Sequence, residues 1–571
     1  MSWKPWLGAV PDARGTHFRV WAPKTDSLSV KVQGGPTVLL RREADGTFTG
    51  RADGVQPGAR YFYRFPDGRE RPDPASLLQP EGVHGPSEVV NLAAIAPKSP
   101  RSKVPLEKLV FSEIHLGTYT EEGTAEGAAR FMPELAGARF TAVEVMPVAA
   151  FPGSRNWGYD GVAPFAAQAS YGGPSGLARL VDAAHAAGLS AFLDVVYNHL
   201  GPEGNYLCEF GTYFTPKHKT PWGDALDFSL AQVRRYFVEN ALRWVSRAGG
   251  GFDGLRLDAV HGIYDDSPKH ILQEIADAVH AEGGLVIAES DLNDGKLVEQ
   301  YHLDGTWADD LHHGLHVALT GESQGYYEDF QDPMPKIAAA IERGWFYEGQ
   351  HKPSFGRAHG RPAAHLRARH FVVCAQNHDQ IGNRARGERL TELTDEGGLR
   401  AAAALIALQP ALPLYFQGEE WGAREPFQYF VSHGDAELVE AVRKGRREEF
   451  KAFTWTDVPD PFAEEAFRRS RVDRSRKDER ALQWHKALLK LRQEHPALQH
   501  DSRTGVRAWT QGKVLLMQRG PVLVAAAFDA QPSEVRLPAG KWRALLDSGV
   551  AELGPERLRF RGRGAVVLEQ G

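Results

Sequence analysis

Apolar and polar positions alternate along three short runs close to the N-terminus. The runs are 16–23, 27–34 and 59–65, and the last one closes on the turn sequence Pro66-Asp67-Gly68. An alternation with a period of two, interrupted by turn residues, is typical of the antiparallel strands of a β-sandwich. We therefore expect a sandwich at the N-terminus, with the Pro, Ser and Lys-rich stretch 97–105 as its boundary.

From about residue 106 the pattern changes to short β-rich runs that alternate with longer stretches of helical periodicity, such as 176–187 and 232–247. This alternation is typical of βα units around a parallel sheet. Eight such runs favour a closed (β/α)8 barrel. A doubly wound sheet is the alternative, but no GxGxxG phosphate loop follows any run. The eight runs are 109–116, 142–147, 190–197, 254–258, 285–289, 306–309 (the weakest), 371–376 and 412–417.

The last part of the chain begins with a helical pattern over 477–494 and then returns to short strands. The strand runs there are 513–520, 521–529, 542–547 and 565–570. The expected fold class is therefore multidomain α/β, with a central (β/α)8 TIM barrel between an N-terminal immunoglobulin-like β-sandwich and a C-terminal β-sandwich. The expected domains are 1–97, 98–485 and 486–571.

Composition narrows the possible partners. The chain has 571 residues and a formal net charge of −6, which gives no reason to expect binding to nucleic acid or to a membrane. Two cysteines, Cys208 and Cys374, are too few for a disulfide framework and lack zinc-site spacing. We expect a cytoplasmic location, because the N-terminus lacks a signal-peptide core and no apolar run is long enough to span a membrane.

Polar residues end four of the eight strand runs. The carboxyl ends of barrel strands meet at one face, where the active sites of such enzymes lie. Each residue alone has an ordinary alternative as a turn residue, a helix N-cap or a structural histidine. Four runs that end in this way on one face favour an active site. The residues are Asp194, Asn198 and His199; Arg256, Asp258 and His261; Glu289; and Asn377, His378 and Asp379.

The carboxyl groups among them suit the cleavage of a glycosidic bond. This reaction needs one ionised carboxylate and one carboxyl group that carries a proton. Neighbouring like charges and partial burial can separate the two pKa values. Arg256 lies two residues before Asp258 on one strand, so it points the same way and can keep Asp258 ionised. His199 and His378 can donate hydrogen bonds to sugar hydroxyls.

The runs DVVYNH, GLRLDAVH, VIAES and QNHDQ, in this order, resemble the signature regions of the α-amylase superfamily. The resemblance implies that Asp258 is the nucleophile, Glu289 the general acid/base and Asp379 the transition-state stabiliser. It also implies retention of the anomeric configuration, for which the carboxyl groups of Asp258 and Glu289 lie about 5–5.5 Å apart. The supporting residues would be Arg256, His199 and His378.

Further stretches resemble the maltooligosyltrehalose trehalohydrolases within that superfamily. FRVWAP is similar to an early-set domain, and the others are FSEIHLGTYTEEGTAEGA, FPGSRNWGYDGV, DDSPKH and DDLHH. Branching enzymes share HLG and NWGYD but normally lack the last two. The resemblance implies hydrolysis of the α-1,4 bond next to the terminal α,α-trehalose of maltooligosyltrehalose, with release of trehalose. It also implies a pathway partner, a maltooligosyltrehalose synthase.

The same resemblance implies which loops contact the substrate. Residues near the trehalose end would include Asp265, Asp266, His270 and the range 310–313, although Ser267 and Pro268 also fit an ordinary helix start. Tyr159 and Trp157 are expected to stack on sugar rings, and packing within the loop is the alternative for both. The substrate-binding candidates beyond the supporting residues are the stacking pair Tyr159 and Trp157, together with His261, Asp310 and His313.

Two other interpretations stay open at this point. A branching transferase would use the same covalent intermediate and pass it to a sugar hydroxyl. A non-catalytic relative would typically lose its carboxylates, whereas all three are present here. No cofactor is expected, and no obligatory calcium, because the acidic residues of the short segment 200–228 are scattered.

Overall fold

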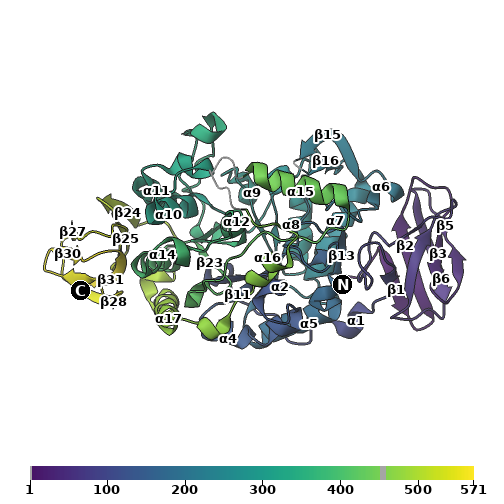
Figure 1. The fold of residues 1–571 in the computed structure, drawn as a ribbon, viewed down its shortest axis with the longest axis horizontal. Coiled ribbons are helices and arrows are strands. Elements are labelled where there is room, and N and C mark those ends of the chain that lie inside the picture. Colours follow the sequence, from purple (N-terminus) through teal and green to yellow (C-terminus); the bar gives the residue numbers. More distant parts are fainter. Residues whose placement is uncertain (1–2, 221, 450–457) are drawn as a thin grey trace.

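The computed structural model describes residues 3–220, 222–449 and 458–571. Figure 1 shows a barrel with its helices in the middle, the N-terminal sheets on one side and the C-terminal sheets on the other. No helix of the described ranges is both long and apolar enough to cross a membrane. The molecule therefore consists of one α/β body between two β parts, as the sequence predicts.

The central sheet is a closed barrel of eight parallel strands in chain order. The first strand pairs with the last, with Phe111 opposite Leu414, and this pairing closes the ring. All eight predicted runs form strands, so the (β/α)8 prediction is confirmed. The strands are β10 (Phe111–Ile114), β11 (Ala142–Val145), β14 (Ser190–Val195), β17 (Gly254–Leu257), β18 (Leu285–Ala288), β19 (Gly305–Trp307), β22 (Phe371–Cys374) and β23 (Leu412–Phe416).

The barrel interior has an apolar layer below a charged one. Phe111, Phe192 and Ile287 belong to a buried cluster inside the barrel. Because side chains two residues apart on a strand share a face, the residues two positions further on, such as Glu113 and Asp194, also point inward. The polar groups are thus carried at the carboxyl ends of the strands, above a packed core.

Helices surround the barrel (Figure 1). The helical patterns predicted over 176–187, 232–247 and 477–494 form α5, α7 and α17. A helix start at Ser267 and Pro268 was wrong: α8 begins at Ile271 with His270 as its N-cap. The larger helices are α5 (Gly173–Ala186), α7 (Ala231–Val245), α8 (Ile271–Ala281), α10 (Asp310–Thr320), α11 (Pro333–Arg343), α14 (Glu396–Leu408), α15 (Ala436–Glu449) and α17 (Glu479–Glu494).

Short helices and small hairpins fill the loops between these elements. The short helices are α1 (Leu92–Ile95), α2 (Leu116–Tyr119), α3 (Ala125–Ala129), α4 (Met132–Gly137), α6 (Leu207–Phe210), α9 (Lys296–Glu299), α12 (His378–Gly382), α13 (Leu390–Leu393) and α16 (Glu464–Arg469). The hairpins are β12 (Ala149–Ala150) with β13 (Ala163–Ala167), β15 (Phe214–Thr220) with β16 (Gly223–Leu226), and β20 (His351–Lys352) with β21 (Arg357–Ala358).

The N-terminal part is a sandwich of two sheets around one core that includes Phe18, Phe48, Val30 and Tyr63. It packs on the barrel where the Tyr236 hydroxyl of α7 donates to the main-chain oxygen of Pro74 at 2.7 Å. One sheet holds β1 (Gly8–Asp12), β2 (Gly15–Trp21), β6 (Thr47–Asp53) and β5 (Arg41–Arg42). The other holds β4 (Thr37–Leu39), β3 (Ser29–Val32), β7 (Arg60–Arg64), β8 (Glu70–Arg71) and β9 (Ser87–Glu88).

The C-terminal part is a second sandwich, in which Leu516, Leu523 and Val566 of one sheet meet Leu558 and Phe560 of the other. Its larger sheet holds β24 (Val506–Gln511), β25 (Val514–Arg519), β26 (Val522–Ala527), β31 (Gly564–Gln570) and β28 (Trp542–Asp547). Its smaller sheet holds β27 (Ser533–Arg536), β30 (Arg557–Phe560) and β29 (Ala551–Leu553).

The barrel interior leaves no room for a side chain at the start of β17. We expect Gly254→Ala to lower the free energy of unfolding by about 1–3 kcal/mol, because the added Cβ would lie 2.2 Å from Cε1 of Phe192. Gly137→Ala in α4 is the control: nothing lies within 4 Å of its Cβ, so stability should stay level or rise by up to about 1 kcal/mol. Denaturant unfolding followed by circular dichroism compares the two, and equal midpoints would contradict the packing argument.

Candidate active site

The carboxylate of Asp258, which follows β17, is held on both oxygens. Oδ1 lies 2.6 Å from Nη1 of Arg256 on the same strand. The amide of Asn198 donates to Oδ2 at 2.8 Å and to the main-chain oxygen of Asp258 at 2.9 Å. The contact with Arg256 is the one that the two-residue spacing predicts. Asp258 is therefore fixed in place and paired with a permanent cation.

Arg256 is the buried cation of the charged layer. Its side chain has no exposed surface, and Nη1 also lies 2.7 Å from Oδ2 of Asp194. The guanidinium lies over the indole of Trp307, 4.4 Å from the ring centroid. Burial alone would lower its pKa, but the surrounding acidic groups, Asp194 first, raise that pKa well above its usual value. The site thus has a fixed positive charge beneath its carboxylates.

Glu289 follows β18 and meets a different environment from Asp258. Its Oε2 accepts the main-chain N–H of Ala259 at 2.7 Å and lies 3.8 Å from Nη2 of Arg256. Burial raises the pKa of this carboxyl, and the charge of Asp258 raises it further, against the opposing effect of Arg256. One carboxyl is thus ion-paired and the other is disposed to hold a proton, which is the division that a glycosidase needs.

Asp379 is the most accessible of the three carboxylates. It is the second residue of α12, the helix that follows β22 after a short loop, and its side chain is 46% exposed. Its Oδ1 lies 3.6 Å from Nε2 of His378 and 3.4 Å from the amide of Asn383. No shorter contact restrains it among the described residues, so this carboxylate can meet a ligand that enters from the open end of the barrel.

His378 is bound through both ring nitrogens. Nδ1 pairs with Oε1 of Glu113 on β10, and Nε2 lies 2.8 Å from the hydroxyl of Tyr159. Burial disfavours the charged ring, but Glu113 and then Asp379 raise the pKa of His378 to about 9. The ring is therefore a second buried cation near neutral pH.

Tyr159 and His199 form the wall beside these charges. The Tyr159 ring is half-buried and stacks on His378, with centroids 5.2 Å apart, and its hydroxyl donates to Oδ2 of Asp194 at 2.6 Å. His199 contacts the main-chain oxygen of Tyr159 at 3.0 Å through Nε2. Its ring stacks on the exposed indole of Trp222 at 4.0 Å. Burial lowers the pKa of His199, so the wall presents a neutral imidazole.

Of the two expected stacking residues, Trp157 is packed inside the protein. Its side chain is buried, its ring stacks on Phe427 at a centroid distance of 5.2 Å, and its N–H donates to the main-chain oxygen of Gln428 at 2.9 Å. No ring face is left for a sugar. The packing alternative therefore describes Trp157, and Tyr159 is the member of the pair that borders the carboxylates.

Asp310, which was expected among the substrate contacts, binds the protein backbone. Its Oδ2 accepts the main-chain N–H groups of Phe346 at 2.7 Å and Tyr347 at 2.9 Å, and the amide of Asn293 at 3.1 Å. A buried carboxylate that binds two backbone donors anchors a loop and has little capacity left for substrate. Asp310 thus holds the loop at 346–347 in place.

Two further candidates lie at the edges of the site. His313 is half-buried and stacks on Phe330 at 5.1 Å, and burial lowers its pKa to about 3. His261 is exposed, with Nδ1 3.6 Å from Oδ1 of Asp291. It is near enough to Glu289 for its charge to lower the pKa of that carboxyl.

The residues of DDSPKH make mostly structural contacts. The fully buried carboxylate of Asp265 accepts from Nη1 of Arg234 and from the N–H of Ile271, both at 2.6 Å. Asp266 is exposed and pairs with Lys217. His270 caps α8 and stacks on Tyr301 at 4.3 Å. Asp265 and His270 therefore hold the loop in shape. The expectation was that they would lie at the substrate.

Sequence reasoning missed Asp309, which follows β19 as the N-cap of α10. It is half-buried, and its pKa is raised to about 7 by burial and by the charges of Glu289 and Asp379. The signal was present, because the sixth strand run was predicted to end at this residue. The substrate-binding candidates include the neighbouring Asp310 in its place.

Two buried glutamates of the charged layer were missed as well. Glu113 pairs with His378, and Glu144 lies opposite it in the register of β10 and β11. Neither carboxylate oxygen of Glu144 has a hydrogen-bond partner among the described residues, and burial raises its pKa well above the usual range. Both sit inside apolar strand runs, so periodicity gave no sign of them.

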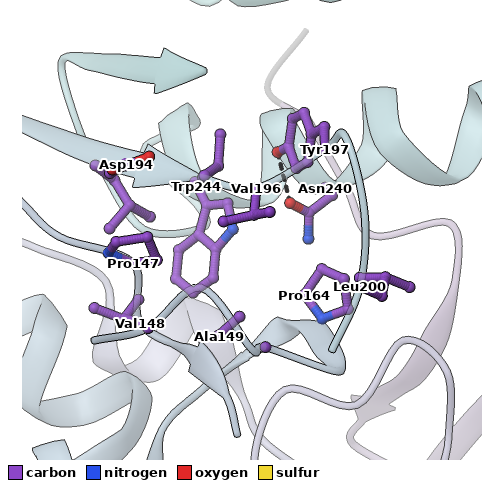
Figure 2. Close-up of a pocket in the computed structure, with 14 residues that line it drawn as sticks. Pro147, Val148, Ala149, Pro164, Asp194, Val196, Tyr197, Leu200, Asn240 and Trp244 are labelled. Carbon is purple, nitrogen blue, oxygen red and sulfur yellow. Dashed lines mark hydrogen bonds between the residues drawn. The ribbon is translucent and has the colours of Figure 1, made fainter. Parts of the chain in front are cut away.

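Behind Asp194 lies a small cavity of 20 Å³ between β14, α7 and the loop that precedes β13. Figure 2 shows Trp244 among the side chains that line it, and the hydrogen bond from the Tyr197 hydroxyl to Asn240 on the side away from Asp194. This volume is enough for about one water molecule. The cavity is thus part of the packing beneath the site, and a sugar does not fit.

Among the described ranges, no group of three or more His, Cys, Asp or Glu side chains is placed to hold a metal ion. The side-chain amide of Asn198 donates to Asp258.

No family model matches the chain. It is 44% identical to the malto-oligosyltrehalose trehalohydrolase of Saccharolobus solfataricus over 85% of this chain and 86% of that protein. A protein of the same name from Deinococcus radiodurans is also 44% identical, over 89% and 86%. A Salmonella typhimurium crystal structure assigned to the alpha amylases superposes with a TM-score of 0.93 at 34% identity, covering both chains completely.

A glucan branching enzyme also matches, but over less of the chain. The protein GlgB of Salinibacter ruber is 32% identical over 44% of this chain and 46% of its own length. The trehalohydrolases match along almost the whole chain. The narrower coverage of the branching enzyme favours the trehalohydrolase group.

The charge of His378 depends on Glu113. We expect Glu113→Gln to bring the pKa of His378 from about 9 to below 6.5, because the anion that stabilises the imidazolium is removed while burial still disfavours it. Ring-nitrogen NMR across the pH range measures this. Glu274→Gln, on the outer helix α8, should leave the titration unchanged. A His378 titration near 9 in both variants would contradict the assignment.

Proposed function

The chain belongs to the malto-oligosyltrehalose trehalohydrolase family, and we propose that it hydrolyses the α-1,4 bond next to the terminal α,α-trehalose of maltooligosyltrehalose, releasing trehalose. One observation of the site carries this proposal. Asp258 is paired with the cation of Arg256, whereas burial raises the pKa of Glu289. Two carboxyl groups in such different environments are what a retaining glycosidase needs.

In the first step, the Asp258 carboxylate attacks the anomeric carbon while protonated Glu289 gives its proton to the departing oxygen. The glycosidic C–O bond breaks, trehalose leaves, and a covalent glycosyl ester of Asp258 forms. Arg256 and Asn198 hold the attacking carboxylate in one orientation. In our proposal the carboxyl groups of Asp258 and Glu289 lie about 5–5.5 Å apart, as retention requires.

In the second step, Glu289 takes a proton from water, and the oxygen of that water attacks the anomeric carbon. The ester bond breaks, Asp258 recovers its negative charge, and the shortened maltooligosaccharide leaves with its configuration retained. Positive charge develops on the sugar ring in both steps. We assign its stabilisation to Asp379, whose carboxylate is open to a ligand.

The substrate contacts within this proposal come from the residues around the carboxylates. They exclude Trp157 and Asp310, whose groups are occupied by protein contacts. Arg256 and His378 act beneath the substrate. They hold the carboxylates and Tyr159 in place and supply positive charge beside them. The remaining proposed contacts are Tyr159, His199, His261 and His313.

The reaction also places the enzyme in a pathway. Its substrate carries a 1,1-linked glucose pair at the former reducing end, so an isomerising synthase that acts on maltooligosaccharides must supply it. We propose this maltooligosyltrehalose synthase as the pathway partner. We also place the enzyme in a reducing compartment, because both described cysteines are free thiols, with Cys208 exposed and Cys374 buried.

Free trehalose is the diagnostic product. We expect the wild-type protein to release it from maltooligosyltrehalose, and Asp258→Asn to lower kcat by about three orders of magnitude or more while the fold persists. Asp266→Asn, on the exposed rim, should keep its activity. Chromatography of the products decides the question: transfer to longer or branched glucans without trehalose would identify a branching transferase and refute the proposal.

Substitutions of the neighbours Asp309 and Asp310 should have different effects, the first on the pH profile and the second on stability. The charge of Glu289 raises the pKa of Asp309, and because repulsion between two charges is mutual, ionised Asp309 should raise the pKa of Glu289 in turn. Asp309→Asn should therefore move the alkaline limb of kcat/KM to lower pH and leave the rate below about pH 6 nearly unchanged, where Asp309 is already neutral. Asp310→Ala removes the acceptor of two backbone N–H groups and should cost about 1–3 kcal/mol of stability without moving that limb. Identical profiles for both variants would contradict the assignment.

A further inference from the structure

The residue after Asp258 has a backbone conformation that L-amino acids rarely adopt. Ala259 has φ 39° and ψ 52°, in the left-handed region, and it is buried. Glycine would normally occupy such a position, because a Cβ is disfavoured there. An alanine held in this conformation at the carboxyl end of β17 indicates that surrounding contacts fix the chain.

Those contacts lie on the peptide unit between Asp258 and Ala259. Its carbonyl oxygen accepts the amide of Asn198 at 2.9 Å, and its N–H donates to Oε2 of Glu289 at 2.7 Å. One residue further on, the N–H of Val260 donates to the main-chain oxygen of Glu289 at 3.0 Å. The peptide is thus held at both ends, and its N–H points at one oxygen of the Glu289 carboxyl.

We propose that Ala259 is a positioning residue, whose left-handed backbone directs its N–H to Oε2 of Glu289 and so leaves Oε1 as the oxygen that carries the catalytic proton. This rests on the proposed role of Glu289 as the acid. In a protonated carboxyl the carbonyl oxygen is the better acceptor, because the hydroxyl oxygen uses its hydrogen to donate. Oε2 also lies on the side of Arg256, 3.8 Å from Nη2, where a proton is disfavoured. The peptide therefore sets which oxygen faces the leaving group.

Three substitutions at Ala259 separate backbone conformation from side-chain size. Glycine and asparagine both tolerate a left-handed backbone, so Ala259→Gly and Ala259→Asn should keep the hydrogen bond and a kcat within about threefold of wild type. Valine is branched at Cβ and resists positive φ. Ala259→Val should lose the bond and lower kcat by about tenfold or more, with KM nearly unchanged.

The pH profile tests the mechanism. A donated N–H stabilises the ionised carboxyl, so its loss raises the pKa of Glu289. In Ala259→Val the alkaline limb of kcat should move to higher pH by about half a unit or more. Arg139 is the control, because it also has positive φ, at 74°, but precedes β11 at the opposite end of the barrel. Arg139→Val should reduce thermal stability and leave the pH profile unchanged.

Carbon-13 NMR of labelled glutamate follows the same proton without turnover, with the Glu289 signal identified by its absence in Glu289→Gln. A titration of Glu289 in Ala259→Val at the wild-type pH would overturn the inference, as would an equal shift in Ala259→Asn, since side-chain size would then be the cause. Absence of trehalose release by the wild type would refute the proposed function but leave this titration measurable. The two failures are therefore distinguishable.

Discussion

The site depends on one buried cation, the guanidinium of Arg256. It contacts Asp194 and Asp258 directly and lies close to Glu289. Without it, several acidic groups would share a buried space with no compensating charge, and the energetic cost of such burial is several kcal/mol per ion. The cation therefore allows the carboxyl groups to lie together, and its unequal distances from them make their environments differ.

The barrel makes this concentration of charge possible by separating two layers along the same strands. Phe111 and Phe192 fill the lower interior, and the residues two positions later, Glu113 and Asp194, lie in the charged layer. The apolar layer excludes water from below and keeps the charged side chains rigid. A rigid, weakly screened layer strengthens each electrostatic interaction. The charge of His378 is an example. It is set by Glu113 on β10, across the pairing of β10 with β23 that closes the barrel.

The range of each interaction explains what the sequence predicts. Strand periodicity is local, so all eight barrel strands could be predicted, and the contact between Arg256 and Asp258 follows from positions on one strand. Contacts that cross the barrel could not. Glu113 lies 265 residues before His378, and Trp157 meets Gln428 across 271 residues. Nothing in the NWGYD segment indicates whether its indole faces a sugar or packs on another loop.

The two aspartate pairs, DDSPKH and DDLHH, show a further limit. In each pair one carboxylate binds backbone N–H groups: Asp265 contacts the N–H of Ile271, and Asp310 those of Phe346 and Tyr347. The other member, Asp266 or Asp309, is left more accessible. The anchoring aspartate comes first in one pair and second in the other, so the spacing cannot distinguish them. Only the path of the following chain, which supplies the backbone donors, decides which carboxylate is anchored and which stays accessible.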